Sequence, residues 1–218
     1  MTKENMHIGN AAGFSGDRMD VGGPVIDSLI ASGQPAALFY ETLAERTLAI
    51  AQRERRANPE KGYTPDLAGF VGPVLKRCVE SGVPIIGNFG AANPMGAAKR
   101  LHALAKEQGI SGLRVAVIEG DDLRENLRGL QTQQWGEEKP LDLANTNILA
   151  ANVYMGSEPI AEALDLNPHI VVTGRVTDSA LTLGPLMHHF GWAADDWDMM
   201  AAGVLAGHLL ECGSQITG

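Results

Sequence analysis

Residues 170–179 read Ile170-Val171-Val172-Thr173-Gly174-Arg175-Val176-Thr177-Asp178-Ser179. The first four residues are apolar or β-branched, as in a buried parallel strand, and a glycine opens the polar segment that follows. A buried strand followed by a polar loop and the first turn of a helix is typical of a strand–loop–helix unit. This stretch therefore predicts one unit of an α/β fold.

The same alternation of short apolar runs and longer helical segments extends along the chain. Strands are predicted at residues 6–8, 36–40, 84–87, 114–118, 148–154 and 170–173. Strands that alternate with helices form parallel sheets, so we predict an open, mainly parallel, doubly wound sheet flanked by helices. Part of a β/α barrel is the alternative, and the irregular strand spacing favours the open sheet.

Helices are predicted from apolar periodicity and from the residues at their ends. Apolar side chains in residues 67–79 recur at spacings of three and four and form one stripe. A helix led by Glu41 ends in a cluster of arginines before Asn58-Pro59. Two more helices are predicted at residues 95–108 and 195–212.

Length, charge and cysteine content limit the class of protein. We predict one α/β domain over residues 1–218, since no repeat or linker divides the chain. The formal net charge of −9 disfavours nucleic acid and anionic membrane surfaces as partners. The two cysteines form no CxxC motif, and no apolar run reaches the roughly 20 residues that span a bilayer, so we expect a cytoplasmic protein.

Residues 129–147 lack clear periodicity and are predicted to form a long loop or lid.

Polar side chains follow the predicted strands, at the edge of the sheet where parallel α/β proteins bind ligands. They are Asn10, Asp17 and Arg18 after the first strand, Asn88 and Asn93 after the third, Glu119, Asp121 and Asp122 after the fourth, and Arg175, Thr177 and Asp178 after the sixth. We expect these loops to form a ligand pocket. The glycines of the first loop match no nucleotide-binding fingerprint, so tight turns alone stay an alternative there.

Two groups of charged residues have candidate chemical roles. Glu119, Asp121 and Asp122 place three carboxylates within four residues, which suits Mg²⁺ binding or a general base, while helix capping would explain one aspartate. Arg175 is the expected anion-binding residue, because a guanidinium group holds a carboxylate or phosphate in bidentate fashion. An internal ion pair with Asp178 is the alternative.

His208 and Cys212 lie four residues apart on the last predicted helix and share one of its faces. This spacing allows a metal site or a Cys–His pair. The surrounding leucines favour a buried cysteine and a satisfied histidine instead, so no zinc site is predicted. The common hydrolase and zinc-protease motifs are missing from the sequence, so no motif names a reaction.

Four motifs resemble the N-terminal region of the acyclic terpene utilisation family, AtuA. They are Ile8-Gly9-Asn10 through Gly16-Asp17-Arg18, Val117 through Glu119-Gly120-Asp121-Asp122, Thr173-Gly174-Arg175-Val176-Thr177-Asp178-Ser179-Ala180, and Gly207-His208-Leu209 through Glu211-Cys212-Gly213. With the shorter similar segments between them they span almost the whole chain. The family is named for bacterial degradation of branched terpenoids such as citronellol and geraniol, through acyl-coenzyme A intermediates. Because family members are longer, the resemblance also implies an N-terminal portion of a longer protein.

The resemblance implies a catabolic enzyme that acts on branched, acyclic terpenoid-like acids or their acyl-CoA esters. The expected catalytic residues are Glu119, Asp121, Asp122 and Asp178, and the expected substrate-binding residues are Asn10, Asp17, Arg18, Asn88, Asn93, Arg175 and Thr177. The alternative is a non-catalytic binding or assembly subunit that pairs with a pathway enzyme or with a second copy of the chain. The cofactor stays open, with Mg²⁺ as the candidate.

Overall fold

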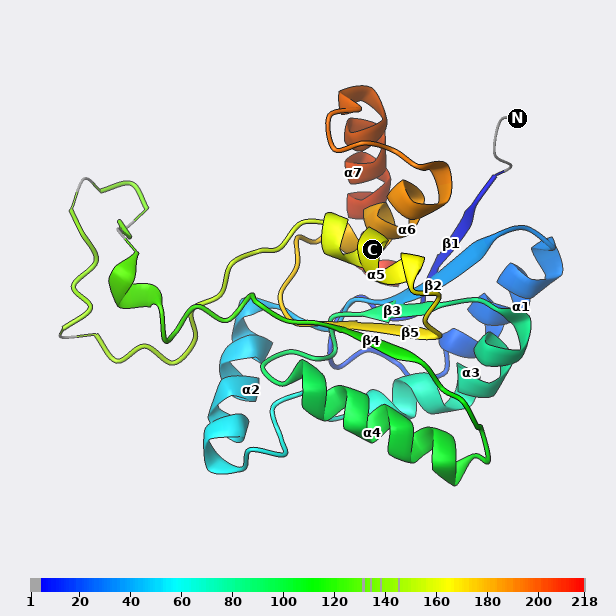
Figure 1. Ribbon diagram of the computed structural model, residues 1–218, viewed down its shortest axis with the longest axis horizontal. Coiled ribbons are helices and arrows are strands. Elements are labelled where there is room, and N and C mark those ends of the chain that lie inside the picture. The colour runs from blue at the N-terminus through cyan, green and yellow to red at the C-terminus, as the bar shows by residue number, and fades with distance from the viewer. Residues whose placement is uncertain (1–4, 131, 134, 138, 145, 218) are drawn as a thin grey trace.

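The computed structural model describes residues 5–130, 132–133, 135–137, 139–144 and 146–217. In this part of the chain, five parallel strands form one open sheet in the order β1-β2-β3-β5-β4 (Figure 1). The strands are β1 (His7–Asn10), β2 (Ala36–Tyr40), β3 (Ile85–Gly87), β4 (Val115–Ile118) and β5 (Ile170–Thr173). The predicted α/β fold with an open parallel sheet is confirmed.

Helices cover both faces of the sheet. On one face lie α1 (Gly22–Ser32), α3 (Leu67–Ser81) and α4 (Pro94–Glu107), and on the other lie α5 (Glu158–Asp165) and α6 (Ala180–Phe190), with α7 (Trp197–Glu211) packed on α6 (Figure 1). The helix α2 (Glu45–Ala57) follows β2 beyond the carboxyl end of the sheet. Two short 3₁₀ helices complete the described elements, η1 (Leu127–Gly129) and η2 (Gly213–Thr217).

The strands divide the core into two layers because their side chains alternate between the two faces. Leu38 and Ile85 pack with α1, α3 and α4, whereas Phe39 and Ile86 pack with α5 and α6. Strands buried on both faces read as continuous apolar runs, which is why they are recognisable in the sequence.

Most predicted elements are found within a few residues of their expected bounds, and α2 is the main helical exception. It begins at Glu45 rather than at Glu41. The N–H of Glu41 donates to the Ala12 carbonyl and that of Thr42 to Asn88 Oδ1, so these groups bond to neighbouring loops instead of starting a helix. The segment between β2 and α2 thereby becomes part of the site described below.

The predicted strand at residues 148–154 is wrong. This segment crosses beyond the carboxyl ends of the strands, and its N–H and carbonyl groups pair with loops: Val153 N–H donates to the Asp121 carbonyl, and Leu123 N–H to the Ala151 carbonyl. An apolar run indicates burial of side chains, but a strand also needs a neighbouring strand edge, which this segment does not reach.

The predicted long loop at residues 129–147 falls in the connection from β4 to α5, which extends away from the sheet (Figure 1). Residues 131, 134, 138 and 145 of that prediction lie outside the described part of the chain. Among the helices that the structure describes, none combines the length and apolarity needed to cross a bilayer.

Candidate functional site

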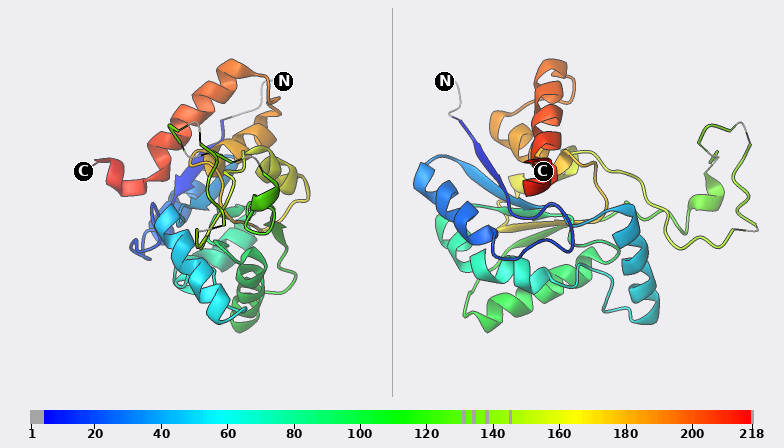
Figure 2. Two further views of the ribbon diagram at one scale, coloured as in Figure 1. Left: turned by 90° about the vertical axis from the view of Figure 1, so that its left-hand side faces the viewer. Right: turned by 180° about the vertical axis from the view of Figure 1, so that it is seen from behind.

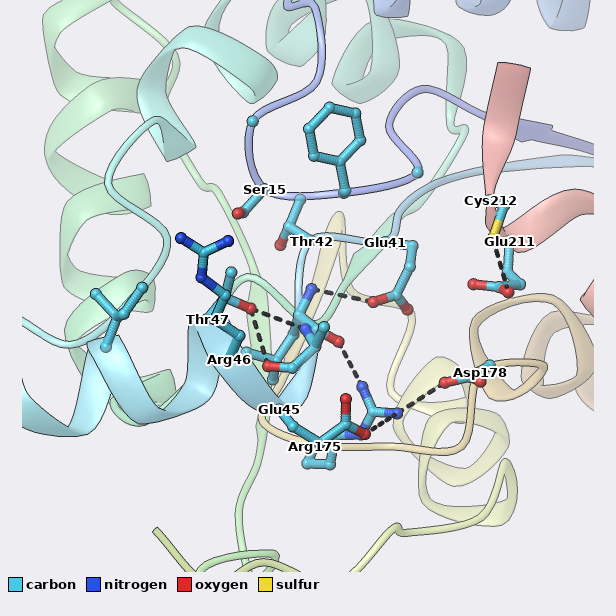
Figure 3. Close-up of a pocket in the computed structure, with 16 residues that line it drawn as sticks. Ser15, Glu41, Thr42, Glu45, Arg46, Thr47, Arg175, Asp178, Glu211 and Cys212 are labelled. Atoms are coloured by element: carbon cyan, nitrogen blue, oxygen red, sulfur yellow. Dashed lines mark hydrogen bonds and ion pairs between the residues drawn. The ribbon is translucent and has the colours of Figure 1, made fainter. Parts of the chain in front are cut away.

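A cavity of about 530 Å³ lies at the carboxyl end of the sheet, and its volume falls in the range of small-molecule sites. Four segments far apart in the sequence line it: the loop after β1, the segment from β2 into α2, the loop after β5 and the end of α7 (Figure 3). Parallel α/β proteins bind ligands at this edge because loops and helix ends meet there.

Glu41, the first residue after β2, brings a buried carboxyl group to this cavity and is 5% exposed. Its Oε1 accepts hydrogen bonds from Asn88 Nδ2 at 2.6 Å and from the Leu43 N–H at 3.0 Å. Its Oε2 is buried and has no hydrogen-bond partner among the described residues.

Burial raises the pKa of Glu41 to about 7, although the hydrogen bonds from Asn88 and Leu43 and the positive charge of Arg175 oppose the rise. A carboxyl group that titrates near neutral pH and keeps one oxygen free is suited to giving or accepting a proton.

Arg175, from the loop after β5, brings a buried positive charge to the same cavity and is 4% exposed. Its guanidinium group donates to the Leu43 carbonyl and, at 2.7 Å, to Asp178 Oδ1, so the predicted ion pair is present. The guanidinium carbon also lies 4.0 Å from the centre of the Tyr154 ring, in a cation–π contact. Arg175 Nε is buried without a partner among the described residues, which leaves one donor for a ligand.

The end of α7 meets the loop after β5 beside this cavity, and three metal-ligating types of side chain converge there. One ligand atom each of Asp178, His208 and Glu211 lie within 4.8 Å of one another. The close approach requires a glycine in α7, because a Cβ at Gly207 would lie 2.6 Å from Ser179 Cβ.

Cys212 and His208 are both exposed, so the prediction of a buried cysteine beside a satisfied histidine is wrong. Leucines surround them in the sequence, but this end of α7 lies at the surface. Cys212 Sγ donates to Glu211 Oε1 at 3.1 Å, and this hydrogen bond, followed by burial, raises the pKa of the thiol to about 11. The sulfur is therefore protonated at neutral pH.

Asp121 supports the loop that carries Arg175. Its Oδ2 accepts hydrogen bonds from the Arg175 backbone N–H and from Asn152 Nδ2, both at 2.8 Å. Burial raises the pKa of Asp121, and these two hydrogen bonds oppose the rise. A Cβ at Gly174 would lie 2.5 Å from Asp121 Oδ1, so the turn after β5 needs a glycine to pass this carboxylate.

Asn10 and Asp17 organise the loop after β1, which lies against the end of α7 (Figure 2). Asn10 Nδ2 donates to the Leu210 and Glu211 carbonyls and so satisfies groups that a helix C-terminus leaves free. Asp17 Oδ2 accepts from the Gly13 N–H at 2.9 Å. These contacts hold Glu211 in place at the cavity.

The predicted asparagines after β3 lie in different surroundings. Asn88 is fully buried and joins Glu41 to Thr42, since its Nδ2 donates to the carboxyl group and its Oδ1 accepts from the Thr42 N–H at 2.7 Å. Asn93 caps α4 by accepting from the Gly96 N–H at 3.0 Å and lies outside the cavity lining. Of these two, the structure brings Asn88 to the site.

The remaining predicted residues lie outside the cavity lining. Asp122 pairs with Arg124 at 2.6 Å, and Arg18 pairs with Asp20 at 2.7 Å on the surface. Glu119 is exposed after β4, and the Thr177 N–H donates to the Met155 carbonyl. Their expected catalytic and substrate-binding roles stay predictions.

Glu41 was absent from the residues predicted for the site. It directly follows the apolar run of β2, the same position that marks the other candidates. A helix is predicted to begin at this residue, and that gave its polar side chain a structural explanation. The sequence does not single out Glu211 as a site residue, because its contact with the loop after β5 depends on tertiary packing.

A second cavity, of about 120 Å³, shares lining residues such as Leu43 and Ile50 with the first. Its other lining residues include Ala51, Tyr63 and Ala91, so this recess is largely apolar. The site thus joins a charged space to an apolar one.

The family model described as acyclic terpene utilisation family protein AtuA matches residues 6–218. Neither the curated proteins nor the solved structures contain a significant match.

Proposed function

Because the chain belongs to the acyclic terpene utilisation family AtuA, we propose that it is a catabolic enzyme for branched, acyclic terpenoid-like acids or their acyl-CoA esters. The substrate binds in the 530 Å³ cavity, with its carbonyl group at Arg175 and its hydrocarbon part in the adjoining apolar recess.

One observation carries this proposal: two residues that line the same cavity, Glu41 and Arg175, each hold a buried polar atom, Oε2 and Nε, with no partner among the described residues. Buried polar atoms are almost always hydrogen-bonded, so unsatisfied ones on two lining residues favour a ligand that bonds to them. Arg175 Nε donates to an oxygen of the substrate, and Glu41 gives or takes a proton.

The chemistry follows from the placement of Glu41. A base with a pKa near 7 is half ionised at neutral pH and is suited to removing a proton next to a carbonyl group. A hydrogen bond from Arg175 to the carbonyl oxygen stabilises the negative charge that develops there. Asn88 positions Glu41 by holding its other oxygen.

The proposal is tested by exchange of the α-proton of branched acyl-CoA thioesters and free branched acids in deuterated water, followed by mass spectrometry. The wild-type protein is expected to incorporate deuterium, and Glu41→Gln to lose at least about 100-fold in rate, the usual contribution of a positioned base. Glu162→Gln, which replaces an exposed carboxylate on α5, is the matched control. Equal exchange in Glu41→Gln and the wild type would contradict the proposal.

A non-catalytic assembly role is the second candidate, and α7 favours it. Val204, Leu205 and Leu209 on this helix are 38%, 63% and 54% exposed, an apolar surface suited to a protein partner. Light scattering during gel filtration would detect self-association that Leu205→Glu removes. Deuterium exchange by the isolated wild-type chain would argue against a purely structural role.

A further inference from the structure

The residues His208 and Glu211 lie one turn apart on α7 and present their side chains on the same side of the helix. Asp178 reaches them from the loop after β5. An imidazole together with two carboxylates is a common ligand set for divalent transition metals, since imidazole suits Zn²⁺ and Fe²⁺ and carboxylates complete the shell.

The spacing of the three groups fits one ion. Their ligand atoms all lie within 4.8 Å of one another. Two ligands of a tetrahedral zinc ion, each bonded at about 2.1 Å, lie about 3.4 Å apart, so side-chain rotations that bring the ligand atoms closer by about 1 Å close the site. His208 forms no hydrogen bond or ion pair among the described residues, so its imidazole is free to turn towards the ion.

The backbone around the three ligands is held rigidly. Asn10 bonds the carbonyls of Leu210 and Glu211, and Gly207 allows α7 to contact Ser179, the residue after Asp178. Ligands on a fixed backbone bind a metal more tightly because less conformational entropy is lost on binding.

A separate observation also indicates a cation at this place. Figure 3 shows the side chains of Glu41, Asp178 and Glu211 in the same cavity, and Glu41 is 5% exposed with its buried Oε2 lacking a partner among the described residues. The described cavity lining holds four carboxyl side chains and two arginines, those of Glu41, Glu45, Asp178, Glu211, Arg46 and Arg175. Arg175 pairs with Asp178, and the other carboxylates of this partly buried site repel one another, a repulsion that a divalent cation offsets.

We propose that Asp178, His208 and Glu211 bind one divalent transition-metal ion, such as Zn²⁺, at the edge of the cavity beside Glu41. This metal site does not depend on the proposed acid–base role of Glu41.

Isothermal titration of the EDTA-treated and dialysed protein with ZnCl₂ tests the site, and the visible absorption of added Co²⁺ reports the coordination. The wild-type protein is expected to bind one ion per chain. His208→Ala and Glu211→Gln should weaken binding by at least about 100-fold, because loss of even an outer-shell partner costs about 10–100-fold. His102→Ala, which removes an exposed histidine of α4, should bind as the wild type does.

No ion bound by the wild type, or equal binding by His208→Ala, would overturn the proposal. His208 is exposed, so its substitution should leave the fold intact, which circular dichroism checks. The titration uses no substrate, whereas deuterium exchange tests Glu41 on a substrate, so each proposal can fail alone.

Discussion

The substitution Glu41→Gln tests the electrostatic account of the cavity directly. Glutamine has nearly the same volume as glutamate and keeps one oxygen to accept the hydrogen bonds from Asn88 and Leu43. It removes the ionisable group and therefore the cost of holding a negative charge in a buried position.

The magnitude follows from the difference in pKa between the folded and unfolded states. The pKa of Glu41 is about 7 in the folded protein, against 4.5 for an ordinary glutamate. Between these two pH values the folded protein holds a proton that the unfolded chain has released, so wild-type stability falls as the pH rises. The full loss, reached above pH 7, is about 3 kcal/mol.

Urea unfolding between pH 4 and pH 8.5 in the presence of EDTA is the assay, and the difference between variant and wild type isolates Glu41 from other titrating groups. We expect the free energy of unfolding of Glu41→Gln, relative to wild type, to increase by about 3 kcal/mol from low to high pH. Glu162→Gln should show no comparable trend, because its carboxylate is exposed. A difference for Glu41→Gln that stays constant with pH would refute the reasoning.

Three further substitutions test the contacts that build the site. Arg175→Ala removes a buried donor and should lower the free energy of unfolding by about 3 kcal/mol in urea; a loss below about 0.5 kcal/mol would contradict that role. Asp121→Ala leaves the Arg175 N–H and the Asn152 amide unpaired, so about 3 kcal/mol should again be lost and the Arg175 amide should exchange its hydrogen faster, whereas unchanged protection would disagree. Gly207→Ala places a Cβ 2.6 Å from Ser179, which should cost about 2 kcal/mol by thermal unfolding and weaken Zn²⁺ binding; wild-type affinity would show that the close approach is not needed.

Much of the architecture follows from local patterns. The apolar stripe of α3 and the β-branched run of β5 are visible in the sequence because each element buries its own repeating set of side chains. Residues 148–154 show the limit of this reasoning. Their apolar content resembles that of a strand, yet the segment crosses the ends of the other strands and pairs with loops.

The candidate site was predicted in part. The rule that ligand-binding residues follow parallel strands led to Arg175, Asp178 and Asn88, which the structure brings to or next to the cavity. The same rule included Asn93, which caps a helix outside the cavity. A polar residue at a strand end can bind a ligand or cap a helix, and only the direction of its side chain distinguishes the two roles.

The sequence by itself determined the class of the protein: an α/β fold with a parallel sheet, and the family to which its ordered motifs belong. These properties depend on hydrophobic periodicity and on short motifs, both of which are local. Only the tertiary structure decided that Glu41, Arg175 and Glu211 share one cavity, because the order of the strands and the packing of α7 on α6 bring them together. The same packing buries Glu41 and so raises its pKa. The segments that desolvate Glu41 are distant in the sequence, so the residues next to it in the chain do not predict the shift.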